Sequence, residues 1–523
     1  MTRFHFVTSP RIVQMLACAA ALSVLLVIPD SGRAAEFESG RIQVQIAEEA
    51  SIESIEALYG VVAIDSLPPL YLLRVPDGQD EQALIDSMSV DGERFVCVER
   101  AYRTETAEGQ RQMIVAAVGG TLDGYAEQGL VERLHLPALQ AQTSGENAVV
   151  AVLDTGVFAA HEALGGMILP GRDFVDEDDD PAEIMNGADD DQDGAIDEGA
   201  GHGTMVAGIV HLVAPQARIL PVRVLDDEGR GSTFGLAKGI RYAVAQGAGV
   251  INMSLGLTER SGIVLHELAQ ACLASVAMVS AAGNLGVDTV QYFPASDVRV
   301  FMVAALDSVD VKTDFSNYHA RVAVSAPGAG ILGPYVDGGY AIGAGTSFAA
   351  AFISGQCAAL LDLRPDASWE QLYGMVADGV QDIYSIEGNH DYLQKLGTGR
   401  VDGLATLAAA GIAAGGLAAD EGAGDVWTPR VVPQPAGTHA VLHLVFPESS
   451  AGAGSSRVAA MRRFSLHDAS GRLVREFAVP GTERSVAWDG CDGHGRPVPA
   501  GIYLLRLTDQ PAPARTLRVI LVR

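Results

Sequence analysis

The chain has 523 residues, of which 48% are hydrophobic and 19% are charged, and its formal net charge at pH 7 is -30. This length exceeds what one hydrophobic core usually supports, so we expect three or four folding units. The apolar content excludes a mostly disordered protein. The negative charge argues against a nucleic-acid partner, because nothing would offset repulsion by phosphate groups, and it favours bound cations.

Residues 1–35 are predicted to form an export signal. Two arginines precede an apolar run, residues 12–28, and small residues follow up to Ala35, after which we expect cleavage. The alternatives are lipid attachment at Cys18 and a retained membrane anchor, for which the apolar run is short. The sequence therefore predicts an exported protein, either secreted or associated with the cell envelope.

Strand-like and helix-like segments alternate in residues 36–115. Residues 41–46, 71–75 and 95–98 have the pattern of strands, and residues 52–58 and 81–88 have the spacing of helices. This order predicts a small α/β sandwich. Because it follows an export signal, we interpret it as a propeptide, and the alternative is an N-terminal domain retained in the mature protein.

Apolar runs and helical segments alternate again in residues 116–412. Residues 148–153 are apolar throughout, as expected of a parallel strand buried on both faces. Four similar runs and four helices follow: strands at 219–225, 250–253, 276–281 and 300–304, and helices at 205–213, 234–246, 265–275 and 348–363. The alternation predicts an α/β fold with a doubly wound, mainly parallel sheet and functional residues at the strand ends.

Three short segments of this region each place one polar residue among glycines and small residues. They are AVLDTG with Asp154, GHGTMVAG with His202, and GTSFAA with Ser347. Asp, His and Ser together can convert a weakly nucleophilic hydroxyl into an attacking group. In this order, the segments resemble the catalytic motifs of the subtilases, the subtilisin-like serine peptidases.

This resemblance implies a serine endopeptidase with an Asp-His-Ser triad. Asp154 would orient His202, which would act as general base toward Ser347 and then as general acid toward the leaving amine. Ser347 opens a helix whose N-terminus favours an oxyanion, and Asn284 matches the family's side-chain donor to that oxyanion. Two segments match the family's substrate-binding strands: Ser254, Leu255 and Gly256, and Ala281, Ala282 and Gly283.

The sequence departs from the family pattern in two places. Met205 stands where a second histidine is usual, and Ala351-Phe352 stand where Pro-His is usual. None of these is a triad position, so the departures bear on fine specificity more than on activity. The resemblance also covers residues 36–115, which are similar to the inhibitory propeptide of subtilases; this similarity implies self-processing, with the propeptide as the enzyme's own inhibitor.

An acidic stretch without lysine or arginine, residues 173–198, separates the first two motifs. Aspartates at alternate positions before Gly194 are typical of the start of an EF-hand calcium loop, although Ala200 stands where the loop's last glutamate is usual. We therefore expect an irregular structural calcium site, and the alternative is a solvated acidic loop. The candidate ligands are Asp189, Asp191, Asp193 and Asp197.

The five cysteines show no metal-ligand spacing. Removal of the signal and a propeptide would leave three of them: Cys272, Cys357 and Cys491. We expect buried free thiols, and a disulfide between Cys272 and Cys357 is the alternative.

The C-terminal part changes character after residue 412. Residues 413–432 are rich in Ala and Gly and are predicted to be a linker. Residues 433–523 contain short alternating runs separated by turns, which predict a β-sandwich. The pattern from Asp468 through Trp488 to Tyr503 resembles the immunoglobulin-like domain of flagellar hook-capping proteins and the sorting modules of secreted proteins. That similarity implies contact with the cell surface or the secretion machinery.

Together these features predict an exported, self-processing serine endopeptidase that hydrolyses polypeptides through an acyl-enzyme intermediate. One alternative is a catalytically silent envelope or surface module that uses the same fold for binding. The intact triad and Asn284 count against it, since a binding module has no need to keep all four residues. A narrow maturation protease that acts on one partner is a further alternative.

Overall fold

The computed structural model describes two compact units, residues 1–415 and 416–523. In the first it describes residues 36–107, 116–117 and 120–412, without residues 191 and 290; the predicted export signal lies outside the described residues. In the second it describes short stretches, which are 430–432, 442–445, 462–468, 472–479, 485–488, 491–494, 496, 498, 501–507 and 516–521.

The N-terminal module, residues 36–107, is a small α/β sandwich. Its antiparallel sheet has the order β4-β1-β3-β2, and its two helices pack on one face around a core that includes Ile42, Ile55 and Met88. Ser51 and Asp80 cap the helices by accepting hydrogen bonds from backbone N–H groups of the first turn. The elements are β1 (Phe37–Ile46), α2 (Ile52–Tyr59), β2 (Val62–Leu67), β3 (Leu70–Arg74), α3 (Glu81–Ser89) and β4 (Phe95–Thr106).

A nine-stranded sheet forms the centre of residues 116–412. Its order is β17-β18-β14-β13-β12-β10-β6-β8-β7, and every pair is parallel except β17 with β18. The order proceeds outward in both directions from β6, as in a doubly wound sheet. Its strands are β6 (Val149–Asp154), β7 (Arg172–Asp173), β8 (Arg218–Arg223), β10 (Val250–Met253), β12 (Ala277–Ala281), β13 (Val300–Leu306), β14 (Val324–Pro327), β17 (Val380–Gln381) and β18 (Arg400–Val401).

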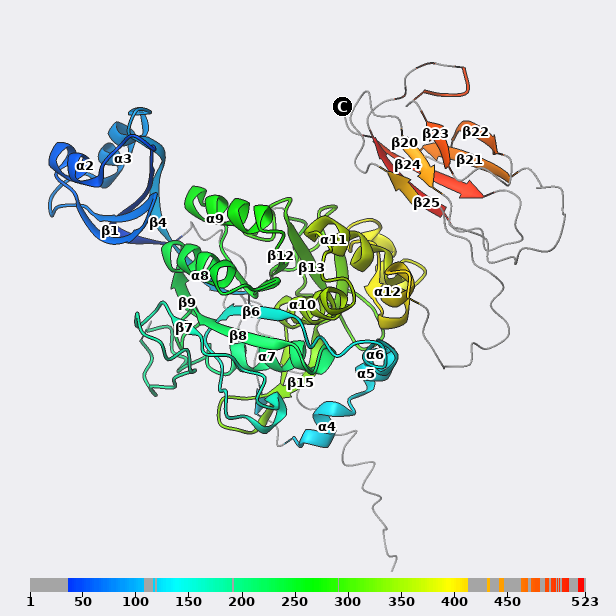
Figure 1. Ribbon diagram of the computed structural model, residues 1–523, viewed down its shortest axis with the longest axis horizontal. Coiled ribbons are helices and arrows are strands. Elements are labelled where there is room, and N and C mark those ends of the chain that lie inside the picture. Colours follow the sequence, from blue (N-terminus) through cyan, green and yellow to red (C-terminus); the bar gives the residue numbers. More distant parts are fainter. Residues whose placement is uncertain are drawn as a thin grey trace, which may run out of the picture. The chain divides into compact units, whose positions relative to one another are not determined.

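Helices cover both faces of this sheet (Figure 1). Along β6, Val150 and Val152 pack in one core with α7 (His202–Val213) and α10 (Thr346–Leu363). The intervening residues of β6 pack in a second core with α8 (Thr233–Ala245) and α9 (Gly262–Leu273). Because side chains alternate along a strand, this explains why β6 is apolar throughout. The predicted α/β fold is confirmed.

Shorter elements surround the sheet. A three-stranded sheet has the order β15-β16-β5, and two short strands, β9 and β11, extend the sheet of the N-terminal module beyond β4. The elements are α4 (Leu122–Ala126), α5 (Gly129–Arg133), α6 (Leu136–Gln140), β5 (Ala116–Ala117), β9 (Arg230–Ser232), β11 (Leu255–Gly256), β15 (Ala329–Pro334), β16 (Tyr340–Ala344), α11 (Trp369–Asp378) and α12 (Gly403–Ala409), with 3-10 turns at Glu162–Leu164 and Glu387–Tyr392.

Two observations concern a long apolar helix and two cysteine thiols. Among the described helices, α10 is long and apolar enough to cross a membrane, and most of it is buried in the protein. Cys272 and Cys357 are both free thiols, so the alternative of a disulfide between them is wrong.

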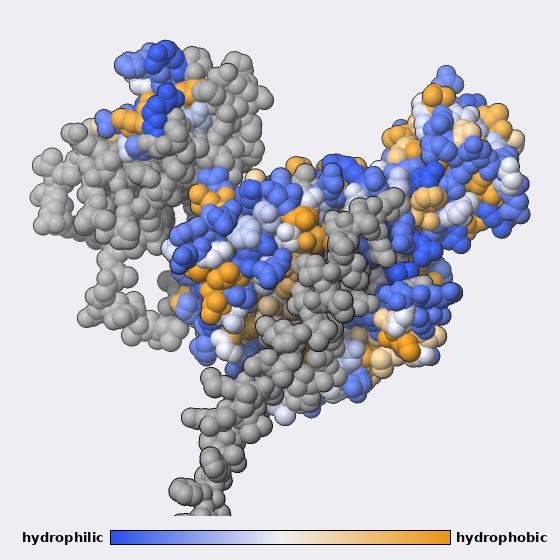
Figure 2. All heavy atoms as spheres, turned by 180° about the vertical axis from the view of Figure 1, so that it is seen from behind, coloured by the Kyte–Doolittle hydropathy of each residue, from blue (hydrophilic) through white to orange (hydrophobic). Residues whose placement is uncertain are grey.

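On the face that Figure 2 shows, hydrophilic residues predominate among the coloured residues, and apolar ones form small scattered groups.

The C-terminal unit has two antiparallel sheets, as expected of a β-sandwich. One has the order β19-β20-β23 and the other β22-β21-β24-β25. The ring centroids of Trp488, in the first sheet, and Tyr503, in the second, lie 5.3 Å apart, and both side chains are buried. The strands are β19 (Arg430–Val432), β20 (Leu442–Val445), β21 (Arg462–Asp468), β22 (Leu473–Val479), β23 (Ser485–Trp488), β24 (Gly501–Leu507) and β25 (Thr516–Leu521); β19 lies in the predicted linker.

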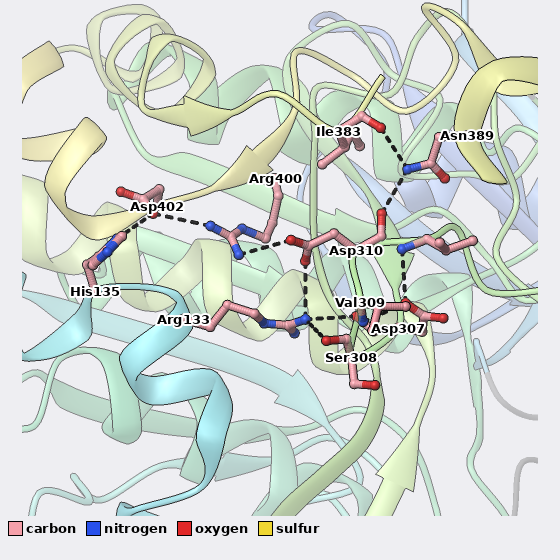
Figure 3. A network of polar contacts seen from close by, with 11 residues as sticks. Arg133, His135, Asp307, Ser308, Val309, Asp310, Ile383, Asn389, Arg400 and Asp402 are labelled. Atoms are coloured by element: carbon pink, nitrogen blue, oxygen red, sulfur yellow. Dashed lines mark hydrogen bonds and ion pairs between the residues drawn. The ribbon is translucent and has the colours of Figure 1, made fainter. Parts of the chain in front are cut away.

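A network of ion pairs around the buried Arg400 and Asp402 joins the beginning and the end of residues 116–412 (Figure 3). The guanidinium of Arg400 on β18 lies 3.1 Å from Asp310 Oδ2 and 3.3 Å from Asp402 Oδ2. Asp402 Oδ2 also lies 2.7 Å from Nδ1 of His135, and Asp310 Oδ1 lies 3.3 Å from Arg133. Segments far apart in sequence are thereby held together beside β18.

Replacement of Arg400 with alanine should destabilise the protein strongly. Arg400 is 5% exposed and Asp402 is fully buried, so the substitution leaves one buried carboxylate and the partly exposed Asp310 without their common partner. Such a loss costs about 3–5 kcal/mol of unfolding free energy, measurable by urea denaturation. Arg41→Ala removes an exposed pair with Glu38 and is the control, with an expected loss below about 1 kcal/mol. Equal losses in the two variants would contradict this account of the network.

Candidate active site

The sequence-predicted residues come from ends of parallel strands and starts of helices. Asp154 is the last residue of β6, and Asn284 follows shortly after β12. His202 is the first residue of α7, and Ser347 is the second residue of α10. All four are buried, and the contacts below bring them to one edge of the sheet.

A hydrogen bond joins the histidine and the aspartate. Nδ1 of His202 lies 2.6 Å from Oδ1 of Asp154, which also accepts a bond of 2.8 Å from the backbone N–H of Thr155. This arrangement orients the imidazole and leaves Nε2 as the atom that can exchange a proton with a nucleophile. The histidine ring lies beside Phe348, with 5.7 Å between ring centroids, and is therefore next to the residue that follows Ser347.

Ser347 is tied to one predicted substrate-binding segment. Its Oγ donates a hydrogen bond of 3.2 Å to the backbone carbonyl of Ser254, and the Ser254 hydroxyl donates one of 3.1 Å to the carbonyl of Ser347. On the other side, the side-chain oxygen of Asn284 accepts bonds from the backbone N–H (3.0 Å) and the hydroxyl (2.9 Å) of Thr346. With its oxygen committed, the Asn284 amide can act elsewhere only as a donor.

A strand of the N-terminal module lies between β9 and β11. Residues 103–105 of β4 pair antiparallel with β9, and Glu105 and Thr106 pair antiparallel with Gly256 and Leu255 of β11. The backbone N–H of Ala107 then donates a bond of 3.4 Å to the carbonyl of Ser254. That carbonyl also accepts from the Ser347 hydroxyl, so Ala107 ends the strand beside Ser347.

Glycines allow this strand to approach. A Cβ added at Gly231 would lie 2.9 Å from Oγ1 of Thr104, and one added at Gly229 would lie 3.1 Å from the side chain of Thr106. The sequence analysis missed both glycines, because Asp226 to Gly231 has the composition of an ordinary turn. Of the two predicted substrate-binding segments, 254–256 pairs with the strand, whereas 281–283 shares a buried apolar cluster with Ala107.

Glu183 is a site residue that the sequence analysis did not identify. It lies in the acidic stretch and is buried, and its carboxyl oxygens accept hydrogen bonds from the hydroxyls of Thr155 and Thr204 and from the backbone N–H of Gly203. Its partners lie one or two residues after Asp154 and His202 in the sequence. Glu183 therefore holds the two motifs together. In the sequence, the only sign of this role is that an acidic residue stands between the two motifs.

Burial raises the pKa of Glu183 to about 7, because the charged form loses hydration; the two threonine hydrogen bonds lower the pKa but do not cancel this effect. The nearby Asp154 also raises it, and His202 lowers it. Glu183, which is bonded to residues that follow Asp154 and His202, consequently changes its charge close to neutral pH.

The acidic loop does not form a metal site from its described residues. The carboxylate of Asp189 accepts bonds from the backbone N–H groups of Asp193 and Gly194, and that of Asp197 accepts from those of Asn186 and Gly187. Asp191 lies outside the described residues. Within the described part of the chain, no three His, Cys, Asp or Glu side chains are grouped to hold an ion. The calcium site therefore stays a prediction, and no chemical step depends on it.

Comparisons with known proteins agree with this geometry. Residues 145–398 match the model of the subtilase family. Thermitase of Thermoactinomyces vulgaris is 36% identical over 247 residues, which are 45% of this chain and 83% of thermitase. The chain belongs to the subtilase family. This subtilase is therefore a subtilisin-like, serine-type peptidase.

Two further proteins are similar to this subtilase. A thermophilic serine proteinase of Bacillus sp. strain AK1 is 38% identical over 221 residues, which are 40% of this chain and 51% of that protein. The crystal structure of fervidolysin from Fervidobacterium pennivorans, a keratinolytic enzyme related to subtilisin, aligns with a TM-score of 0.59 and 22% identity over 94% of this chain and 77% of that one. The second similarity supports the fold alone.

Glu183→Gln should reduce the dependence of stability on pH. Since the folded-state pKa of Glu183 is raised, its contribution to stability is fully present below about pH 4.5 and is lost as the pH rises through about 7. A rise from 4.5 to about 7 corresponds to about 3 kcal/mol. Between pH 4 and pH 8, the unfolding free energy of the glutamine variant should therefore gain about 3 kcal/mol relative to the parent.

The measurement is urea denaturation at both pH values, with both proteins carrying Ser347→Ala to prevent self-digestion. Glu132→Gln, at an exposed position on α5, is the matched control. A pH-independent difference between the Glu183 variant and its parent would contradict a proton held on this side chain.

Proposed function

We propose that this subtilase is an exported endopeptidase, made as a precursor whose N-terminal module inhibits it until the chain cuts itself. The observation that carries this proposal is the strand Arg103 to Thr106 between β9 and β11, which ends with Ala107 beside Ser347. An extended peptide added to strand edges is a common mode of peptide recognition, and its register decides which bond meets the nucleophile.

The proposed reaction follows from the contacts of the four site residues. Nε2 of His202 accepts the Ser347 proton as Oγ attacks the carbonyl carbon of the scissile bond, and Asp154 stabilises the imidazolium that forms. The N–H groups of the Asn284 amide and of the start of α10 would stabilise the oxyanion. The imidazolium then protonates the leaving amine, and a water molecule activated by His202 hydrolyses the acyl-enzyme.

Contacts outside the active site support the role of the N-terminal module as an inhibitor. The Glu99 carboxylate accepts hydrogen bonds from the Ser261 hydroxyl (2.6 Å) and the backbone N–H of Gly262 (2.7 Å), at the N-terminus of α9. A carboxylate at this end of a helix also interacts favourably with the helix dipole. The fully buried Gln43 joins Glu99 to Thr233 at the start of α8. The module thus contacts the N-termini of α8 and α9, the helices that precede segments 254–256 and 281–283 in the chain.

The register of the strand favours a cut after Ala107. The sequence analysis placed the end of the propeptide at 115/116, within a polar stretch, and residues 108–115 lie outside the described residues. The backbone N–H of Ala107 is bonded to the Ser254 carbonyl, which also accepts from the Ser347 hydroxyl. The Ala107 carbonyl is the next peptide group along the chain. The self-processing site in this proposal is therefore the bond between residues 107 and 108.

Two other parts of the chain complete the proposal. Residues 1–35 direct export and are removed, so the mature protein is secreted or associated with the cell envelope. The C-terminal β-sandwich, predicted from residue 433, contacts the cell surface or secretion machinery. Polypeptides are the substrates.

Self-processing is tested by expression of the exported precursor beside its Ser347→Ala variant. The wild-type chain should shorten with time and yield a new C-terminus at Ala107 and a new N-terminus at residue 108, whereas the variant should keep its length. Intact-mass measurement of both chains checks this. If folded wild-type chain stays uncut, and its catalytic part does not cut unfolded protein, the proposed peptidase is contradicted and a binding module is favoured.

Glu99→Ala should weaken inhibition after the cut. The substitution removes charge-assisted hydrogen bonds at α9, and we expect the cut N-terminal module to dissociate about 10- to 100-fold faster. The measurement is the delay between cutting and the appearance of activity on a peptide. Glu93→Ala, at an exposed position of the same module, is the control and should leave the delay unchanged. Equal delays for both variants would contradict the role given to Glu99.

A further inference from the structure

The hydroxyl of Thr155 lies between the two buried carboxyl groups of the site. Its Oγ1 is 3.3 Å from Oδ1 of Asp154 and is also hydrogen-bonded to Oε1 of Glu183. The backbone N–H of Gly203 donates to the same Oγ1 at 3.0 Å. A hydroxyl carries one proton and accepts at two lone pairs. One proton and one lone pair of Thr155 therefore remain for Asp154 and Glu183 together.

The main chain keeps Glu183 beside this hydroxyl. The N–H of Val157 donates to the carbonyl of Pro181 at 3.0 Å, and a Cβ added at Gly156 would lie 2.7 Å from that carbonyl oxygen. The hydroxyl of Thr204 donates to the other carboxyl oxygen of Glu183, Oε2. The carboxyl group cannot turn away without the loss of these contacts.

The protonation state of Glu183 decides where the Thr155 proton points. When Glu183 is ionised, both carboxyl groups only accept, and they compete for the single hydroxyl proton. When Glu183 carries a proton on Oε1, it donates that proton to the remaining lone pair of Thr155, whose own proton then turns to Asp154. Only in this second state is each of the three groups paired with its neighbour.

The donors to Asp154 in turn affect His202. Oδ1 of Asp154 receives Nδ1 of His202 and the N–H of Thr155, whereas Oδ2 is buried and has no hydrogen-bond partner among the described residues. With one donor fewer, Asp154 is a stronger acceptor and stabilises the imidazolium more. The charge of an ionised Glu183 acts in the same direction: His202 lowers the pKa of Glu183, so by reciprocity an ionised Glu183 holds the His202 proton more firmly.

Other titratable groups around Glu183 leave this coupling intact. From the elements packed against it, the groups that face Glu183 are Asp154 at the end of β6, His202 at the start of α7, and Tyr335 between β15 and β16. Burial raises the pKa of Tyr335 from its ordinary value of 10.0, so this phenol stays neutral below that pH. Near neutral pH, the charges that change are therefore those of Glu183 and His202.

We propose that Glu183 is a positioning residue that sets how firmly the site holds the proton on His202, and that the hydroxyl of Thr155 transmits its state to Asp154. A protonated Glu183 favours the neutral imidazole, which is the form that accepts the Ser347 proton, and an ionised Glu183 opposes it. This inference rests on the proposed function, because it concerns the general base of the same reaction.

The first experiment follows kcat/KM against pH for the mature full-length enzyme and its Glu183→Gln variant. The substrate is an end-blocked peptide that copies residues 103–110, in which no group titrates between about pH 5 and pH 9. The midpoint of the rising limb should lie about 0.5 to 1 pH unit lower in the variant. The two curves should converge near about pH 5, because Glu183 is protonated there in the wild type as well. A merely structural role would instead lower the curve by one factor at every pH.

Variants of Thr155 test the transmission. Thr155→Ser keeps the hydroxyl, so Glu183→Gln in that background should move the midpoint as it does in the wild type. Thr155→Val removes the hydroxyl, so the same substitution should move it by less than about half as much, since only the direct charge interaction remains. Glu132→Gln, at an exposed position on α5, is the control and should leave the midpoint unchanged. Equal shifts in the Ser and Val backgrounds would overturn the role of Thr155.

A second measurement depends neither on activity nor on cutting. In the Ser347→Ala chain with ¹⁵N-labelled histidine, NMR follows the protonation of His202, whose signal is identified by its absence in His202→Ala. Glu183→Gln should lower the midpoint of this titration by about 0.5 to 1 pH unit. Thr155→Val alone should raise it relative to Thr155→Ser, which decides the matter if the glutamine variant does not fold.

The outcomes separate the two proposals. An unchanged His202 midpoint in folded Glu183→Gln, or equal midpoints in Thr155→Val and Thr155→Ser, would overturn this inference while leaving the peptidase intact. If the midpoint moves as expected but the wild-type enzyme cuts no peptide, the proposed function is wrong, and the coupling between Glu183 and His202 stands.

Discussion

One backbone carbonyl, that of Ser254, connects the N-terminal module with the candidate nucleophile Ser347. It accepts a hydrogen bond from the Ser347 hydroxyl and another from the N–H of Ala107, so the nucleophile and the end of the added strand share an anchor. The anchor depends on β10, a central strand of the parallel sheet whose end leads directly into Ser254. The pairing of Glu105 and Thr106 with β11 then sets which residue arrives at that point. A shift of this register would bring a different bond to Ser347.

A second constraint lies behind the site, where two carboxyl groups are buried close together. Asp154 is stabilised by His202 and the N–H of Thr155, and Glu183 by two threonine hydroxyls and the N–H of Gly203. Removal of charged groups from water is costly, so each carboxyl group needs hydrogen-bond donors or a proton. Glu183 combines both solutions, because its raised pKa allows it to hold a proton near neutral pH. The acidic stretch that carries Glu183 thereby contributes a carboxyl group to the site.

Much of the fold and the candidate triad could be predicted, because their signals are local in sequence. The run before Asp154 is apolar because β6 is buried on both faces, and the glycines around His202 and Ser347 mark close backbone approach. The strand β2 was missed because its residues, VAIDSL, do not alternate between apolar and polar, and because none of its side chains is fully buried. Glu183 was missed for another reason: it acts through partners distant in sequence and does not stand in a recognisable motif. Contacts of this kind follow from the fold and not from local composition.

The central claim is that Ser347 is an activated nucleophile covered by the chain's own strand. The most direct test is the reaction of the wild-type chain with a fluorophosphonate, which labels a serine hydroxyl only when a neighbouring base activates it. Samples are taken during self-processing, and mass spectrometry separates uncut from cut chains. We expect the label on Ser347 in chains freed of residues 36–107, no label in chains that are still uncut, and none in His202→Ala. Equal labelling of uncut chains, or a label on a serine other than Ser347, would contradict the account.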